Sequence, residues 1–122
     1  EFWSYQMGPG ADLHCRRWAR PRVLLSRLEE VATYCRAEGI DLLFLVPPSH
    51  DDYRALLPEH GLADEYALYK RELARLGRVL DRDVPSPLTA DRANFDDPRH
   101  FTPAVARALT AEVVAALAAV PQ

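Results

Sequence analysis

Apolar residues recur at helical spacing in three segments of the chain, and two other short segments are apolar without that spacing. The helical pattern covers residues 22–38, 62–76 and 103–119, which we predict to be amphipathic helices. Residues 40–46 are almost continuously apolar, which is typical of a strand buried on both faces of a parallel sheet. Residues 78–81 have the pattern of a second short strand.

Proline and glycine mark the ends of these helices. Pro21 suits the first turn of the first helix, and Gly39 suits its C-terminal stop. Thr102 and Pro103 are favourable residues for the start of the last helix. The apolar stripe that we expect to face the core from the first helix consists of Leu24, Leu28, Val31 and Cys35.

The other segments have weaker signals. Residues 1–20 are expected to be an irregular N-terminal segment or an edge strand, because aromatic and polar residues alternate over residues 3–7. Residues 49–61 are expected to be a loop with at most one helical turn. Residues 82–101 contain three prolines and are expected to be a long loop, a feature that is often functional in a compact domain.

The order helix–strand–helix–strand–helix over residues 21–120 predicts an α/β fold with a short parallel sheet and flanking helices. Two strands make a small sheet. Further strands could come from residues 1–7, from chain outside this sequence or from a partner. Because open sheet edges invite pairing, we expect self-association or docking of a missing N-terminal half.

Composition narrows the function classes. A chain of 122 residues with 48% hydrophobic residues forms one domain, and its net charge of −3 does not favour nucleic acid as a partner. No apolar run is long enough for a membrane span. The two cysteines, Cys15 and Cys35, could pair or remain free, and the sequence leaves both alternatives open. No cofactor motif is recognisable.

The candidate chemistry centres on Asp97 and His100, which directly precede the last helix. An aspartate can hold the tautomer of a histidine three residues away, and that histidine can then accept a proton from a nucleophile. The alternative is that Asp97 and His100 form a capping arrangement for the last helix.

Three further polar residues follow the predicted strands. Ser49 and His50 come after the first strand and Asp81 ends the second, so all three are candidate substrate-binding residues at the carboxyl edge of the sheet. Alternatively, His50 is an exposed loop histidine that caps a turn with one of the aspartates that follow it.

Metal binding is a weaker hypothesis. A zinc site could be built on paper from the four histidines and one cysteine, but none of these residues shows a close-spaced ligand pattern, so we predict no metal site. These residues are His14, Cys15, His50, His60 and His100.

Residues 35–50 and 95–102 resemble stretches of bacterial SGNH (GDSL-like) hydrolase-fold proteins, especially envelope-associated O-acyltransferases and esterases. The resemblance covers about residues 22–118 and corresponds to the C-terminal half of such a domain. It implies a partial flavodoxin-like three-layer sandwich and a bacterial envelope location. The implied reaction is ester hydrolysis or acyl transfer on an envelope glycan or similar ester. It also implies that His100 is the general base and Asp97 its orienting acid.

The chain departs from this family in one respect. The Gly-Asp-Ser-type block that carries the family's nucleophile is absent, and so are its oxyanion-hole blocks. We therefore expect the chain to contribute the His/Asp pair and, in isolation, to be inactive. The alternatives are a non-catalytic structural or partner-binding relative of that fold and an unrelated α/β domain.

Overall fold

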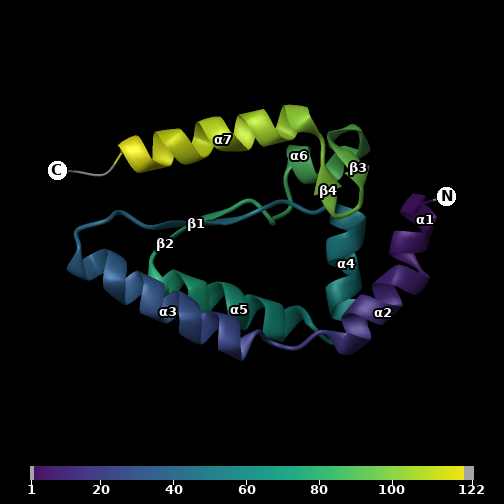
Figure 1. Ribbon diagram of the computed structural model, residues 1–122. Coiled ribbons are helices and arrows are strands. Elements are labelled where there is room, and N and C mark those ends of the chain that lie inside the picture. Colours follow the sequence, from purple (N-terminus) through teal and green to yellow (C-terminus); the bar gives the residue numbers. More distant parts are fainter. Residues whose placement is uncertain (1, 120–122) are drawn as a thin grey trace.

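The computed structural model describes residues 2–119 and has three layers around a two-stranded parallel sheet (Figure 1). The sheet consists of β1 (Leu43–Val46) and β2 (Arg78–Asp81). The helix α7 (Pro103–Ala118) covers one face, and α3 (Arg22–Ala37) and α5 (Ala63–Leu76) lie on the other. The predicted α/β class, with a short parallel sheet and flanking helices, is confirmed.

The two strands pair in parallel, with Leu43 opposite Arg78 and Val46 opposite Asp81. Their carboxyl ends therefore lie at the same edge of the sheet. On the right of Figure 1, this edge faces the helices α4 (Asp51–Glu59) and α6 (Pro87–Ala90). It also faces a hairpin made of β3 (Phe95–Asp97) and β4 (His100–Phe101).

The sheet is more exposed than the continuous apolar run of β1 predicts. Val46 is buried, but Leu45 is 38% exposed. The predicted inward stripe of α3 is also only partly correct, because Cys35 is buried while Leu24 and Val31 are exposed. The reason is that, in the described part of the chain, α5 packs along α3 and each strand has one neighbouring strand. One flank of this apolar surface is therefore not covered by residues 2–119.

Gly39 ends α3 as predicted. It has a φ of +67°, a left-handed conformation that suits glycine. The Ile40 N–H donates to the Cys35 carbonyl at 2.8 Å and the Gly39 N–H to the Arg36 carbonyl at 3.4 Å. These are the two hydrogen bonds of a Schellman motif, and they turn the chain from α3 into β1.

The N-terminal segment is helical, so the prediction of an irregular segment or edge strand is wrong. It forms α1 (Phe2–Met7) and α2 (Pro9–Arg17). Pro9 occupies the first turn of α2, where proline is tolerated, and therefore starts a helix instead of breaking one. Ala11 and Cys15, four residues apart, are buried on one face of α2, which contacts α4.

Residues 49–61 also form more structure than predicted, because they contain α4 (Asp51–Glu59). His50 is its N-cap, and its ring Nδ1 accepts a hydrogen bond from the Asp52 N–H. Gly61, with a φ of +69°, ends the segment.

The predicted loop of residues 82–101 contains four short elements. These are α6 (Pro87–Ala90), the 3-10 helix η1 (Arg92–Asn94), β3 (Phe95–Asp97) and β4 (His100–Phe101). The strands β3 and β4 form an antiparallel hairpin separate from the main sheet. Within residues 2–119, no helix is long and apolar enough to cross a membrane.

Candidate active site: an aspartate–histidine pair beyond the sheet

Asp97 and His100 face each other across the tight turn of the β3–β4 hairpin. The hairpin lies beyond the carboxyl ends of β1 and β2 (Figure 1). It is attached to the segment that follows β1, because the His50 N–H donates to the Pro98 carbonyl at 2.9 Å. The structure therefore brings the segment that follows β1 and the β3–β4 hairpin together at this edge of the sheet.

The carboxylate of Asp97 is buried, and both of its oxygens have hydrogen-bond partners. Its Oδ1 accepts the backbone N–H groups of Arg99 at 2.9 Å and His100 at 3.2 Å. Its Oδ2 lies 2.7 Å from His100 Nδ1. Burial raises the pKa of Asp97, but these hydrogen bonds outweigh it and hold the pKa below its ordinary value.

The ionised state of Asp97 fixes the tautomer of His100. A carboxylate can only accept, so Nδ1 must carry the proton that is donated to Oδ2. In the neutral imidazole the lone pair is then on Nε2. The His100 side chain is 69% exposed, so Nε2 is open to an approaching proton donor. This arrangement suits a general base.

The alternative role of Asp97 as a cap for the last helix does not hold. Asp97 accepts from Arg99 and His100, so it stabilises the hairpin turn. The N-cap of α7 is Thr102, as predicted, although its side chain makes no capping hydrogen bond.

His50 has the opposite tautomer and a different environment. Its Nδ1 accepts from the Asp52 N–H at 3.1 Å, so the neutral ring carries its proton on Nε2. Nε2 is buried and has no hydrogen-bond partner within residues 2–119. The ring packs edge-on against Trp3 and Phe95, at centroid distances of 5.1 and 5.6 Å. His50 does cap a turn together with Asp52, but it is buried and not exposed as the loop alternative assumed.

Ser49 is engaged by a carboxylate that was not among the candidates from the sequence. Its hydroxyl donates to Asp83 Oδ1 at 2.6 Å, and its N–H donates to the same oxygen at 2.8 Å. The Ser49 hydroxyl therefore points to a buried acid and not to a histidine.

Asp83 is the centre of a buried cluster. Besides Ser49, it accepts from Arg54 at 2.9 Å and from the Tyr66 hydroxyl at 2.5 Å. Burial raises the pKa of Asp83, but the hydrogen bonds from Ser49 and Tyr66 and the charge of Arg54 lower it overall. Burial and the hydrogen bond to Asp83 together raise the pKa of Tyr66. The Asp83 carboxylate is therefore ionised, satisfied by its partners and almost completely buried.

Asp81 is occupied by an ion pair at the end of β2. Its carboxylate lies 2.9 Å from Lys70 Nζ, and Lys70 also donates to the Asp83 carbonyl at 2.7 Å. Asp81 Oδ1 accepts the Asp83 N–H at 3.0 Å. Of the three candidate substrate-binding residues, Ser49, His50 and Asp81, each is thus engaged by neighbouring protein groups.

The two cysteines are both buried and free, which settles the question that the sequence left open. No group of three or more histidine, cysteine or acidic side chains within residues 2–119 has the geometry to hold a metal ion.

Comparison of the chain with models of known protein families, with curated proteins and with solved structures finds no match.

Proposed function

We propose that this chain is the C-terminal part of an SGNH-like esterase or acyltransferase that acts on an envelope glycan or a similar ester. In this proposal His100 is the general base and Asp97 holds it in place. The observation that carries the proposal is the 2.7 Å contact between a buried, ionised Asp97 and His100 Nδ1, which leaves Nε2 on the exposed side of the ring.

The nucleophile and the oxyanion donors come, in this proposal, from outside these residues. The four serines of the chain are Ser4, Ser26, Ser49 and Ser86. The Ser49 hydroxyl donates to Asp83, and the Ser86 hydroxyl caps α6. Ser4 and Ser26 lie within helices α1 and α3. None of these hydroxyls contacts His100 among the described residues.

The uncovered apolar surface beside β1 supports a second half that docks there. Within residues 2–119, each strand of the main sheet has one neighbouring strand, so one edge of β1 has no strand paired to it there. Exposed apolar side chains lie on β1, on the segment before it and on the helices of both outer layers. They are Val31, Tyr34, Ile40, Leu45, Val114 and Leu117.

The test is to read the gene upstream of the codon for Glu1 and to express the whole reading frame. We expect a strand followed by a Gly-Asp-Ser or Gly-Ser-Ser block, and hydrolysis of p-nitrophenyl acetate by the whole protein. The 122-residue chain alone should show negligible turnover. A positioned base contributes about 10²–10⁴-fold, and only when a nucleophile is within reach.

The decisive variant is His100→Ala in the whole protein, which should abolish turnover. The matched control is His14→Ala, because His14 is an exposed histidine of α2 whose side chain makes no hydrogen bond among the described residues. Turnover that survives His100→Ala, or robust turnover by the isolated chain, would contradict the proposal.

A second candidate function is a non-catalytic, partner-binding relative of the same fold. The engagement of Ser49 and Ser86 in structural hydrogen bonds favours it, since neither of these serines is available to His100. A reading frame that begins at this chain, with no nucleophile block ahead of it, would favour this candidate over the first.

A further inference from the structure

A cavity of about 340 Å³ lies behind the hairpin, between α2, α4, α5 and the segments that follow β1 and β2. Its volume is within the range of about 300–1,000 Å³ that is usual for small-molecule sites. Neither Asp97 nor His100 lines it, so it is distinct from the aspartate–histidine pair and has no part in the proposed ester chemistry.

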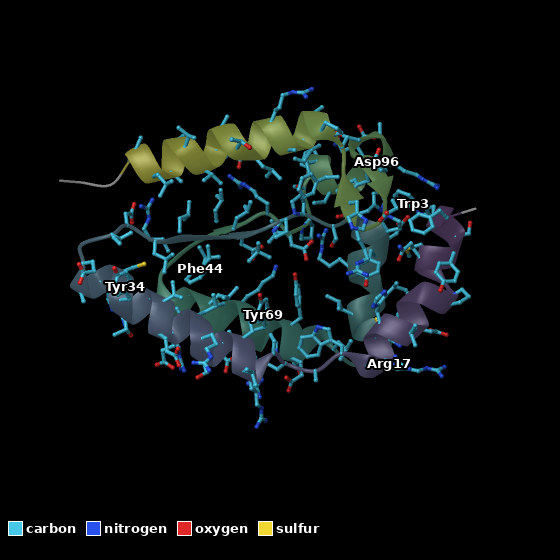
Figure 2. The ribbon with its side chains drawn as sticks, viewed as in Figure 1. Trp3, Arg17, Tyr34, Phe44, Tyr69 and Asp96 are labelled. Atoms are coloured by element: carbon cyan, nitrogen blue, oxygen red, sulfur yellow. The ribbon has the colours of Figure 1, made fainter. Side chains whose placement is uncertain are left out.

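Aromatic rings form much of the cavity wall. Trp18 comes from the end of α2, Tyr53 from α4, and Tyr66 and Tyr69 from α5. The rings of Tyr66 and Tyr69 are stacked, with centroids 6.2 Å apart. Figure 2 shows Tyr69 extending from α5 on the side that faces the strands. Leu57 and Leu62 add aliphatic surface, so the cavity suits an apolar body.

The buried charges in the wall cancel each other. Asp83 pairs with Arg54 and also accepts from Ser49 and Tyr66, so this part of the wall carries no unpaired charge. Burial raises the pKa of the Cys15 thiol and of the Tyr53 phenol, and both groups are therefore neutral at pH 7. A charged ligand finds no partner in the depth of the cavity.

Arg99 lines the cavity next to Tyr53 and offers a ligand an exposed guanidinium; His14 lines the cavity as well. The Arg99 guanidinium lies 5.6 Å from the centroid of the Tyr53 ring, and no carboxylate among the described residues forms an ion pair with it. The acidic residue Asp12 of α2 is instead held by His60 at 3.5 Å and Arg16 at 3.9 Å. An exposed arginine above an apolar cavity is complementary to an anion with an apolar tail.

We infer that this cavity binds small carboxylates with an apolar body, with the tail among the aromatic rings and the carboxylate on Arg99. The inference does not depend on the proposed esterase function, because it uses neither Asp97 nor His100. Arg99 connects the two regions only through the backbone, since its N–H donates to Asp97.

The experiment uses Trp18 as the reporter. The chain has two tryptophans, so the Trp3→Phe variant leaves Trp18 alone in the cavity wall. This variant is titrated with hexanoate and with hexanamide at constant ionic strength, and binding is followed by Trp18 fluorescence and by calorimetry. We expect saturable binding of hexanoate, with an affinity about 10–100-fold higher than that of hexanamide. This ratio corresponds to the contribution of one charge-assisted hydrogen bond to binding.

Arg99→Gln should remove the preference for hexanoate and leave the binding of hexanamide unchanged. Arg75→Gln is the matched control, since Arg75 is an exposed arginine of α5 that does not line this cavity, and it should keep the preference. Thermal unfolding shows that both variants fold. Equal binding of the two probes, no saturable binding of hexanoate, or a preference that survives Arg99→Gln would overturn the inference.

Discussion

Asp83 and Asp97 are both 5% exposed and lie at the same end of the sheet, yet their partners differ. Every partner of the Asp83 carboxylate belongs to a residue that is itself at least partly buried, namely Ser49, Arg54 and Tyr66. Asp97 accepts two backbone N–H groups and one imidazole, and that imidazole is 69% exposed.

The comparison shows what distinguishes a carboxylate that stabilises the fold from one that can orient a general base. A buried carboxylate whose partners are all largely buried holds the fold, because none of those partners presents a basic group to solvent. Asp97 orients an imidazole that is exposed to solvent, and it stabilises the positive charge that this ring gains when Nε2 accepts a proton. Both aspartates have a lowered pKa, so the pKa alone does not distinguish them.

The largest expected effect is that of Asp83→Asn on stability. The change leaves the largely buried Arg54 with Asp51 as its remaining acidic partner. With the asparagine oxygen in the place of Oδ1, the Tyr66 hydroxyl faces an NH2 group and loses its acceptor. We expect a loss of about 3 kcal/mol in the free energy of unfolding, the low end for breaking a buried ion pair. Urea denaturation measures it.

Asp96→Asn is the control for this prediction. Asp96 is an exposed carboxylate of β3, and Figure 2 labels it on the hairpin. Its replacement should change the free energy of unfolding by no more than about 0.5 kcal/mol. A cost for Asp83→Asn as small as that of the control would show that the cluster does not stabilise the fold.

Asp97→Asn should lower the free energy of unfolding by about 1–2 kcal/mol, which is less than the loss expected for Asp83→Asn. The asparagine keeps an oxygen for the N–H groups of Arg99 and His100, but it presents an NH2 donor to Nδ1 of His100, which can then only accept there. Nitrogen-15 NMR of His100 should also show a shift of the neutral ring away from the Nδ1–H tautomer. Retention of that tautomer in the variant would mean that Asp97 does not orient the ring.

The sequence predicted the sheet and its three main helices because their patterns are strong. The parallel pair and the bounds of α3, α5 and α7 differ from the predicted ranges by a few residues at most. The contact between Asp97 and His100 was also predictable, since it is local and spans a single turn. The catalytic role of the pair remains a proposal.

The Asp83 cluster was not predictable in the same way. Its members are brought together over separations of 17 to 34 residues, and Arg54 belongs to α4, where the sequence predicted a loop. Pro58 within α4 disfavours a helix, whereas the two aspartates in its first turn favour one. The missed signals were a capping residue at His50 and the left-handed glycine at Gly61.

The N-terminal helices were missed for a related reason. Alternation over residues 3–7 favoured a strand, although the buried positions Gln6, Gly10, Ala11 and Cys15 follow helical spacing. The secondary structure of a short segment with a mixed pattern depends on its tertiary contacts. Here those contacts are with α4 and β3.

A third prediction concerns how the free energy of unfolding depends on pH through the two aspartates. Because the native pKa of each lies below the ordinary value of 3.8, the unfolded state binds more protons as the pH falls. Each ionised aspartate therefore contributes stability that is complete above about pH 5 and is lost as the pH falls through its native pKa. We expect the difference in unfolding free energy between the wild type and Asp83→Asn to shrink below about pH 4. If this difference between the wild type and Asp83→Asn grows on acidification, the native pKa of Asp83 is raised and the prediction is wrong.

The smallest expected effect on stability, and the sharpest test of the comparison, is that of His100→Ala. The imidazole is 69% exposed, so its removal buries no charge and leaves Asp97 Oδ2 free to accept from water. We expect a change of no more than about 0.5 kcal/mol in the free energy of unfolding. His50→Ala should cost about 1–2 kcal/mol, because it removes a buried ring and the N-cap of α4. Urea denaturation of both variants measures the contrast. If His100→Ala lowers the free energy of unfolding as much as His50→Ala does, the aspartate–histidine pair stabilises the hairpin. The distinction between Asp97 and Asp83 then fails.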